Sequence, residues 1–352
     1  MHTPILLITF NRPDHTRQTL QRILEAHPRD LYIFQDGARS GNANDALKCQ
    51  HVRDVINELV AEYKVKYSSS LLTLHSYFSE ANLGCGAGPM TGISWFFDNV
   101  EQGIVMEDDC LAHPDFFPYC EELLNKFKKQ ETRSEKQEAR NKKQEARNDK
   151  QETGTEKQER VAFINSTLYD ERWSRALNEE RLTMNDSYGF SRYMVTGAWA
   201  SYREVWQGFD LDLKDMSALK FAWHVYRLTG NLAEAEWWWY QVRAIQQDKN
   251  KKSYWDYQMQ IHLFRQNALT IHPAVNLISN IGFDAEGTHT MTNDGRGDRE
   301  VYPILPLSHP ETVEVNPQRD MHCWAKKQSK GLLKDMLYIV YHLYAWRKKI
   351  IQ

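Results

Sequence analysis

The stretch GIVMEDDCLAHPDFF, residues 103–117, joins an apolar run to three consecutive carboxylates and then to a helix start. The apolar residues are typical of a buried strand, and Pro114 suits the first turn of a helix. The carboxylates are Glu107, Asp108 and Asp109. Each negative charge raises the cost of ionising the next, unless a cation or a hydrogen-bond donor compensates it. The stretch therefore predicts a strand and a helix with a positively charged group bound between them.

The residues before this stretch alternate between strand-like and helix-like segments. The apolar runs cover 5–10, 31–36 and 71–78, and the helical segments cover 14–27, 45–62 and 87–98. Such alternation predicts a largely parallel sheet, which binds ligands beyond the carboxyl ends of its strands. Arg12 follows the first run and Asp36 ends the second. We therefore expect both residues at the same sheet edge as the acidic triplet, residues 107–109.

Bulk composition excludes several classes of protein. A net charge of −3 over 352 residues gives no basic footprint, so no nucleic-acid partner is expected. The five cysteines are scattered, without the paired spacings of a zinc site or a disulfide framework. No apolar run reaches the roughly 18 residues of a membrane span, and the N-terminus has no cleavage site for secretion. These observations predict a cytoplasmic globular protein.

A low-complexity segment interrupts the chain at 129–160. Glutamine recurs there every seven residues, at 130, 137, 144, 151 and 158, and no apolar residue larger than alanine accompanies it. A heptad without an apolar seam cannot form a coiled coil. The segment is therefore predicted to be a solvated surface insertion, and a docking arm is the alternative interpretation.

The last part of the chain, residues 291–352, is predicted to be an extension that ends in an amphipathic helix. Within 331–352, apolar residues line one side, and Arg347, Lys348 and Lys349 lie near the end. Such a helix fits the surface of an anionic membrane, the chain's own domain or a second subunit of a homodimer. The pattern leaves these three alternatives open.

Several features have both a chemical and a structural interpretation. Carboxylates at a sheet edge suit Mg²⁺ or Mn²⁺, but acidic residues also stabilise a helix start through its dipole. The Gly-rich run at 82–88 would let backbone amides approach a diphosphate, although a tight turn is the simpler interpretation. Asp256 is a candidate base or a helix cap beside a packed tryptophan. The aromatic run at 237–240 fits a helix core better than a sugar platform.

Seven segments follow one another in the order seen in a known family. They are ITFNRPDHTRQTL, FQDGAR, NLGCGAG with GISWFF, GIVMEDDCLAHPDFF, SRYMVTGAWASYREVW, YWDYQ and PAVNLISNIGFDAEGTHT. This series resembles the nucleotide-sugar glycosyltransferases of the GT-A fold, and among them the bacterial relatives of N-acetylglucosaminyltransferase I. The resemblance spans residues 3–290 without the heptad insertion. Its most specific part is EDDCLAHPDFF, which contains a motif of the DXD type.

The resemblance implies a fold and a division of the chain. The implied fold is α/β, with a mixed, mostly parallel sheet flanked by helices and a helical C-terminal appendage. Residues 1–128 would form the half that binds the nucleotide sugar, and residues 161–290 the half that binds the acceptor. The segment VTGAWASYREVW would form a loop and a helix beneath the sugar.

The resemblance also implies roles for individual residues. The metal ligands would be Asp109 and His289, and the catalytic base would be Asp256, whose neighbour Trp255 would contact the donor. The other donor contacts would come from Arg12 near the nucleotide, Asp36 at the base, Asp108 near the ribose and Glu107 at the donor sugar. One departure is that related sequences often have a basic residue where NLGCGAG has small ones, so the diphosphate contact expected there is missing.

The function implied is that of an inverting, metal-dependent hexosyltransferase. It would move a sugar from a nucleoside-diphosphate sugar, with UDP expected, to a hydroxyl of a glycan or lipid-linked acceptor in bacterial surface polysaccharide synthesis. One alternative is a nucleotidyltransferase, but ITFNRPDHTRQ lacks the Gly-rich, basic loop expected after its first strand. The other is a catalytically silent sugar-binding scaffold, which would have lost Asp109 or Asp256, and both are present.

Overall fold

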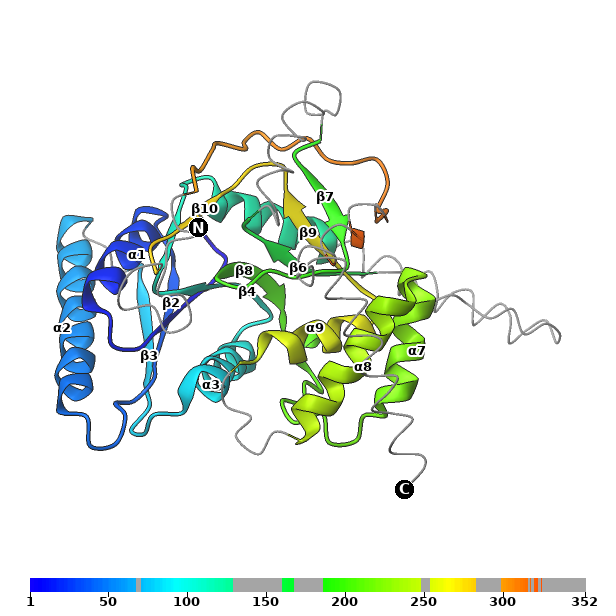
Figure 1. Cartoon of the computed structure of the whole chain (residues 1–352). Helices are drawn as coiled ribbons and strands as arrows, with labels where there is room; N and C mark the ends of the chain where they lie inside the picture. Colours follow the sequence, from blue (N-terminus) through cyan, green and yellow to red (C-terminus); the bar gives the residue numbers. More distant parts are fainter. Residues whose placement is uncertain are drawn as a thin grey trace, which may run out of the picture.

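An eight-stranded mixed sheet forms the centre of the protein (Figure 1). The structure is a computed structural model, and it describes residues 1–67, 71–128, 160–167, 186–247, 254–282 and 299–315, together with 317, 320, 321 and 324. The strand order is β3-β2-β1-β4-β8-β6-β9-β7, and β7 and β8 run opposite to the other strands. The predicted fold class, a mostly parallel α/β sheet flanked by helices, is confirmed.

The bounds of the elements follow from the backbone hydrogen bonds. The strands are β1 (Ile5–Thr9), β2 (Asp30–Gln35), β3 (Thr73–Phe78), β4 (Gln102–Glu107), β5 (Cys110–Ala112), β6 (Arg160–Asn165), β7 (Tyr188–Ser191), β8 (Ala198–Tyr202), β9 (Ala268–Pro273) and β10 (Ile278–Asn280). The helices are α1 (Pro13–Glu25), α2 (Ala43–Lys66), α3 (Gly84–Asn99), α6 (Arg203–Trp206), α7 (Ala218–Thr229), α8 (Leu232–Gln247) and α9 (Asp256–Arg265). A further helix covers 116–128.

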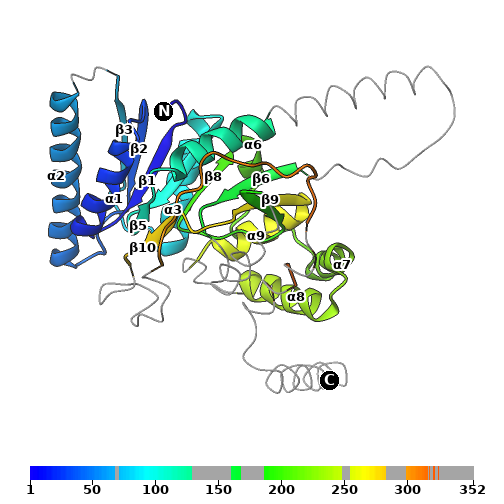
Figure 2. The ribbon, with the colours of Figure 1, turned by 90° about the horizontal axis from the view of Figure 1, so that it is seen from above.

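Two pairs of helices lie at opposite ends of the sheet. Helices α1 and α2 pack together beside β1 to β3, whereas α7 and α8 pack together at the far end (Figures 1 and 2). Helix α3 packs against β1, β2 and β4. It approaches β2 closely, because a β-carbon at Gly92 would lie only 2.6 Å from the Phe34 ring. This close packing brings the start of α3 to the end of β2.

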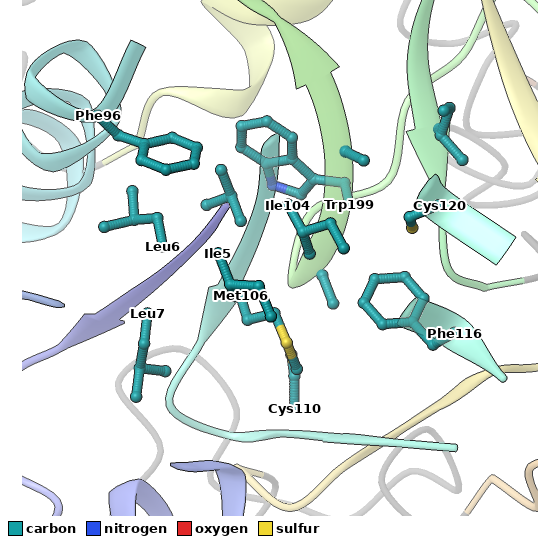
Figure 3. Packing of buried hydrophobic residues seen from close by; sticks show 14 of the residues in the cluster. Ile5, Leu6, Leu7, Phe96, Ile104, Met106, Cys110, Phe116, Cys120 and Trp199 are labelled. Atoms are coloured by element: carbon teal, nitrogen blue, oxygen red, sulfur yellow. The ribbon is translucent and has the colours of Figure 1, made fainter. Parts of the chain in front are cut away.

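One main core spans the two parts of the chain that the heptad segment separates. Strand β4 pairs with β8, so 1–128 and the residues after 160 share one sheet. In Figure 3, Ile5, Leu6 and Leu7 of β1 lie close to Ile104 and Met106 of β4 and to Trp199 of β8, all fully buried. The two sequence halves therefore form a single folding unit around the sheet.

A second, smaller core lies between α7, α8 and α9. It contains Phe221, Trp238 and Phe264, with Trp238 only 1% exposed. Trp237 and Trp239 pack against its rim, whereas Tyr240 is exposed. The aromatic run at 237–240 is thus mainly a helix core, as the simpler interpretation predicts.

Both ends of the heptad segment lie at the amino edge of the sheet. Lys128 is the last described residue of the preceding helix and forms an ion pair with Glu101, which directly precedes β4. Arg160 is the first residue of β6, which runs in the same direction as β4 because both are antiparallel to β8. Arg160, the last residue of the predicted insertion 129–160, thus belongs to the sheet. Residues 129–159 lie outside the described residues.

Other boundaries also differ from the sequence predictions. Helix α3 begins at Gly84, so the Gly-rich run forms its first turn and is not a separate tight turn. The segment expected as a loop and a helix instead contains strand β8 followed by the single-turn helix α6. The predicted C-terminal helix lies outside the described residues. None of the helices within the described ranges is long and apolar enough to cross a membrane.

Candidate active site

Several of the predicted site residues lie at the carboxyl edge of the sheet. Strands β1, β2 and β4 are parallel neighbours, so their ends lie side by side. Arg12 follows β1 and precedes Pro13, the first residue of α1. Asp36 follows β2, and Glu107 is the last residue of β4. The topology thereby brings one basic group and the acidic triplet together.

The positive group that compensates the triplet is Arg12. Its Nη2 donates to Asp108 Oδ1, and its Nη1 donates to Asp109 Oδ2 at 3.2 Å. The Arg12 and Asp108 side chains are 17% and 3% exposed. Burial opposes the charged guanidinium, but the charges of Asp108 and Asp109 outweigh it and raise the pKa of Arg12 above its ordinary value. Arg12 therefore stays positively charged at the edge of the sheet.

Two carboxyl groups of the triplet, those of Glu107 and Asp108, have raised pKa values. Withdrawal from water raises the pKa of Glu107 to about 8, and the charges of Asp109 and Asp108 add to the increase. The pKa of Asp108 rises to about 6, again through burial, although Arg12 opposes the rise. One guanidinium thus compensates only part of the negative charge gathered here.

One carboxylate oxygen atom of Asp108 and Asp109 lacks a partner, and the other three accept hydrogen bonds. Asp108 Oδ2 is buried and has no hydrogen-bond partner within the described ranges. Asp109 Oδ1 accepts from Asn280 Nδ2 at 3.3 Å and from Cys110 Sγ at 3.6 Å, and the Asp109 side chain is 13% exposed. A buried acceptor without a partner is costly unless a ligand or water completes it. Asp108 Oδ2 is therefore the point at which a further donor or cation would bind.

A segment from far along the chain covers Asp109. Strand β10 pairs antiparallel with β5, and the Ile281 amide donates to the Asp109 carbonyl at 2.9 Å. A β-carbon at Gly282 would lie 2.3 Å from Asp109 Oδ2, so a larger residue here would have to displace the Asp109 side chain or the cover. His15 Nε2 donates to the Ile281 carbonyl at 3.1 Å. Hydrogen bonds to Asp109 and to His15 therefore both hold this covering segment in place.

Asp36 ties the end of β2 to the start of α3. Its Oδ1 accepts from the amides of Gly37 and Leu83 at 2.9 and 2.8 Å. Its Oδ2 accepts from the Gly84 amide at 3.0 Å and from Asn82 Nδ2 at 3.1 Å. Burial raises the pKa of Asp36, although these backbone amides oppose the rise. The contacts seen are structural, and its role at a nucleotide base stays a prediction.

Asp256 enters the site from the second half of the chain. It is the first residue of α9, is half-buried and makes no side-chain hydrogen bond to any residue that the structure describes. Its charge contributes to the high pKa of Glu107, which places the two carboxyl groups within electrostatic range. No side chain caps this helix start, so the cap interpretation of Asp256 is not what the structure shows.

Trp255 supports this position from the core. It is 6% exposed, and its ring centroid lies 6.1 Å from those of Trp199 and Trp206. The described contacts make it a packing residue beneath Asp256, and its predicted contact with the donor remains a prediction.

The ligand atoms available at the site suit a hard divalent cation only in part. Carboxylate oxygens are preferred by Mg²⁺ and Mn²⁺, but among the oxygens of Asp108 and Asp109 only Asp108 Oδ2 has no partner within the described ranges. His289, the other predicted ligand, lies outside the described residues. Within the described ranges, no group of three or more His, Cys, Asp or Glu side chains is arranged to hold a metal ion. Arg12 binds the remaining carboxylate oxygens, Oδ1 of Asp108 and Oδ2 of Asp109.

Some site residues were not predicted. Thr19, whose Oγ1 donates to the Asp108 carbonyl at 2.8 Å, lies within a helix pattern that shows only its apolar face. His15 also lies in that helix. Asn280 and Gly282 belong to a quoted segment, but nothing in their local pattern indicates that they lie against Asp109.

Comparisons with known proteins add little evidence about the function of this site. A scan against protein-family models finds no match, and a search of curated proteins finds none either. Among solved structures, the galactosyltransferase LgtC in complex with donor and acceptor sugar analogs is similar at 11% identity and a TM-score of 0.32, over 93% of this chain and 97% of that chain. An active-site mutant of LgtC gives 10% identity and a TM-score of 0.31, over 92% and 95%. At these TM-scores the likeness supports no shared activity, and neither comparison points to N-acetylglucosaminyltransferase I.

Proposed function

We propose that this protein is a nucleotide-sugar glycosyltransferase of the GT-A type. The observation that supports the proposal is the meeting of Arg12 and the acidic triplet at the carboxyl edge of the sheet, within electrostatic range of Asp256. Asp256 makes no hydrogen bond to a described residue and so is available to a substrate. The ordered sequence segments of the GT-A resemblance supply the reaction class.

The proposed donor is a UDP-sugar carrying a hexose. Its diphosphate would lie at the edge where β1 and β4 end, because ligands of parallel sheets bind there. Asp109 would hold Mn²⁺ or Mg²⁺, with His289 joining it from a position seven residues after Gly282 in the sequence. When bound, the cation supplies positive charge against the charge that develops on the leaving diphosphate.

Asp256 is the proposed general base. An acceptor hydroxyl has a high pKa and needs a carboxylate within hydrogen-bond reach to take its proton as the new bond forms. The buried Trp255 holds the start of α9 in place, which fixes the carboxylate next to the donor. One base with no enzymic nucleophile gives direct displacement, and therefore inversion at the anomeric carbon. The acceptor is proposed to be a glycan or lipid-linked sugar of a bacterial surface polysaccharide, from the resemblance alone.

The experiment that tests the proposal is a calorimetric titration of the full chain with UDP, with and without Mn²⁺. The wild type is compared with Asp109→Ala and with the matched control Asp98→Ala, an exposed residue of α3. We expect cation-dependent UDP binding that Asp109→Ala loses and Asp98→Ala keeps. Binding of GDP, CMP or dTDP in place of UDP would mean that the donor is a sugar linked to that nucleotide and not a UDP-sugar. Binding of no nucleotide would overturn the proposal and favour a silent scaffold.

A further inference from the structure

We infer that the outer face of α7 is a surface that binds an anionic lipid bilayer. Helix α7 lies at one end of the molecule, beside α8 and beyond the sheet (Figures 1 and 2). Its inner face, which contains Phe221 and Val225, packs into the smaller core. Its outer face carries Leu219, Trp223 and Tyr226, whose spacing places them along one stripe of the helix. These three residues are the outer stripe of α7.

The outer stripe is exposed although its side chains are large and apolar. Leu219 and Trp223 are 73% and 61% exposed, and Tyr226 is 37% exposed. The Trp223 and Tyr226 rings lie against each other, with their centroids 5.5 Å apart. Single exposed apolar residues are ordinary, but a helix that is apolar on two faces is typical of one that is covered on both. The outer stripe therefore indicates a binding partner.

The charged residues beside the outer stripe are positive. Lys220 and Arg227 are both exposed, and they flank the stripe on one side of the helix. The chain has no acidic residue between Asp215, which precedes the helix, and Glu234, which is buried. Long basic side chains can lay their stems along an apolar surface while their charged ends reach lipid headgroups. The outer face of α7 therefore complements a negatively charged, apolar surface.

An anionic bilayer fits these features better than a protein partner made of the same chain. Tryptophan and tyrosine are enriched at bilayer interfaces, where the ring is buried and its polar tip stays in water. A second copy would bring the same basic charges to the contact. The chain's own segment 331–352 is also basic, with Arg347, Lys348 and Lys349 near its end. Neither of these occupants complements the charge beside the outer stripe.

The smaller core connects this face to the candidate site. The Trp238 ring of α8 contacts Phe221 of α7 and Tyr257 of α9, with ring centroids 6.4 and 6.2 Å apart. Asp256 is the first residue of α9. A bilayer bound to α7 would therefore hold the helices that carry the proposed base close to lipid-linked acceptors. The inference does not rest on the proposed function, because a bilayer can bind α7 whatever the reaction is.

The test measures binding of the full chain to lipid vesicles by co-sedimentation, with no nucleotide or sugar present. Vesicles that mix phosphatidylglycerol with phosphatidylcholine are compared with vesicles of phosphatidylcholine alone. We expect binding to the anionic vesicles, and Leu219→Gln and Trp223→Gln should each weaken it by about tenfold. The matched control is Leu47→Gln, which changes an exposed leucine of α2 at the other end of the molecule and should bind as the wild type does.

A second set of variants tests the charge. Lys220→Gln combined with Arg227→Gln should weaken binding to the anionic vesicles by about tenfold or more and leave binding to neutral vesicles unchanged. The control Arg22→Gln removes an exposed basic residue of α1 and should have no effect. Absence of vesicle binding by the wild type, or unchanged binding in the α7 variants, would overturn the inference. A dimer in solution that Trp223→Gln dissociates would overturn it in favour of a second copy.

Trp223→Phe gives a test that depends neither on a disruptive substitution nor on the reaction. The variant keeps an apolar ring and should still bind the anionic vesicles. Quenching of tryptophan fluorescence by brominated lipids acts at short range, so this variant should lose part of the quenching that the wild type shows. Equal quenching in the two proteins would overturn the inference. Titration with UDP is a separate measurement, so failure of vesicle binding and failure of the proposed function are distinguishable.

Discussion

Two regions of the molecule bury carboxyl groups, and they deal with the charge in different ways. At the sheet edge, Asp108 and Asp109 are paired with the guanidinium of Arg12. In the helical core, Glu234 of α8 is 1% exposed, accepts from the Tyr193 hydroxyl and forms no ion pair with a described residue. Burial raises the pKa of Glu234 to about 7.

This difference distinguishes the candidate binding site at the sheet edge from the helical core, which supports the fold. A carboxylate kept charged by a cation, with an oxygen atom to spare, is ready for a charged ligand. A carboxyl group that is hydrogen-bonded to a hydroxyl in a closed core can lose its charge by taking up a proton. The paired carboxylates at the sheet edge lower the stability of the fold but can bind a ligand. The carboxyl group in the helical core contributes instead to a packed interior. Substitutions in the two regions should therefore affect different measurements.

The largest expected effect is at Asp256, on the side of the site. Replacing it with Asn removes the proposed base and leaves its shape, so sugar transfer should fall by about a hundredfold or more. Binding of the nucleotide should change by no more than a few-fold, because Asp256 is not a proposed ligand of the donor. The measurement is the transfer rate alongside calorimetric binding of UDP, with Glu236→Gln in α8 as the matched control. Unchanged turnover would remove Asp256 from the mechanism.

The next effect tests the core acid through pH. Glu234 has a folded-state pKa of about 7 against an ordinary value of 4.5. Below pH 4.5 both states are protonated, so the stabilisation is fully present there, and it is lost as pH rises through 7. Glu234→Gln keeps the neutral form, so at about pH 8 it should be more stable than the wild type by about 3 kcal/mol.

Chemical denaturation at about pH 4 and pH 8 checks this difference. The free energy of unfolding of the variant and of the wild type should agree at the lower pH and diverge at the higher. Glu236→Gln, two residues along α8, controls for a change of net charge. A constant difference across the pH range would show that Glu234 is charged in the folded protein.

A smaller effect is expected at Gly282, in the cover over the triplet. An alanine β-carbon there would force Asp109 or the cover to shift, because only 2.3 Å separates it from Oδ2. Cation-dependent UDP binding should weaken by about tenfold, with the melting temperature changing little. The control is Gly208→Ala, where φ is +72° and no atom lies within 4 Å of the added carbon. If both variants lose binding equally, the cover does not position Asp109.

The smallest effect is expected from the heptad segment, which belongs to neither region. Replacing residues 130–158 with a short Gly-Ser linker removes no apolar side chain larger than alanine. The melting temperature should therefore stay within about 2 °C of the wild type. Calorimetric scanning measures it. A large loss would show that this segment packs against the domain.

The sequence predicted local features well and distant pairings poorly. The apolar runs that became β1, β2 and β4 are self-contained patterns, because strand composition and turn residues act within a few positions. The convergence of Arg12 and the triplet followed from the rule that parallel strands end at one edge. Their direct contact did not, since side-chain geometry decides which group compensates the triplet.

The cover over Asp109 shows why the remainder could not be predicted. Asn280 contacts Asp109 across 171 positions of the sequence, and no local pattern specifies a pair so far apart. Glu234 was missed for a related reason. It lies in AEAEWWWY, where an acid beside aromatic residues fits the solvent side of a helix, and only the packing of α8 against its neighbours buries it.

The placement of the heptad segment has a consequence for how this gene can vary. Short tandem repeats in DNA gain and lose whole units during replication. Here the units join the fold at Lys128 and Arg160, both at the amino edge of the sheet, whereas the site lies at the carboxyl edge. Changes in length by multiples of seven residues should therefore leave the candidate site, at the opposite edge of the sheet, unaltered.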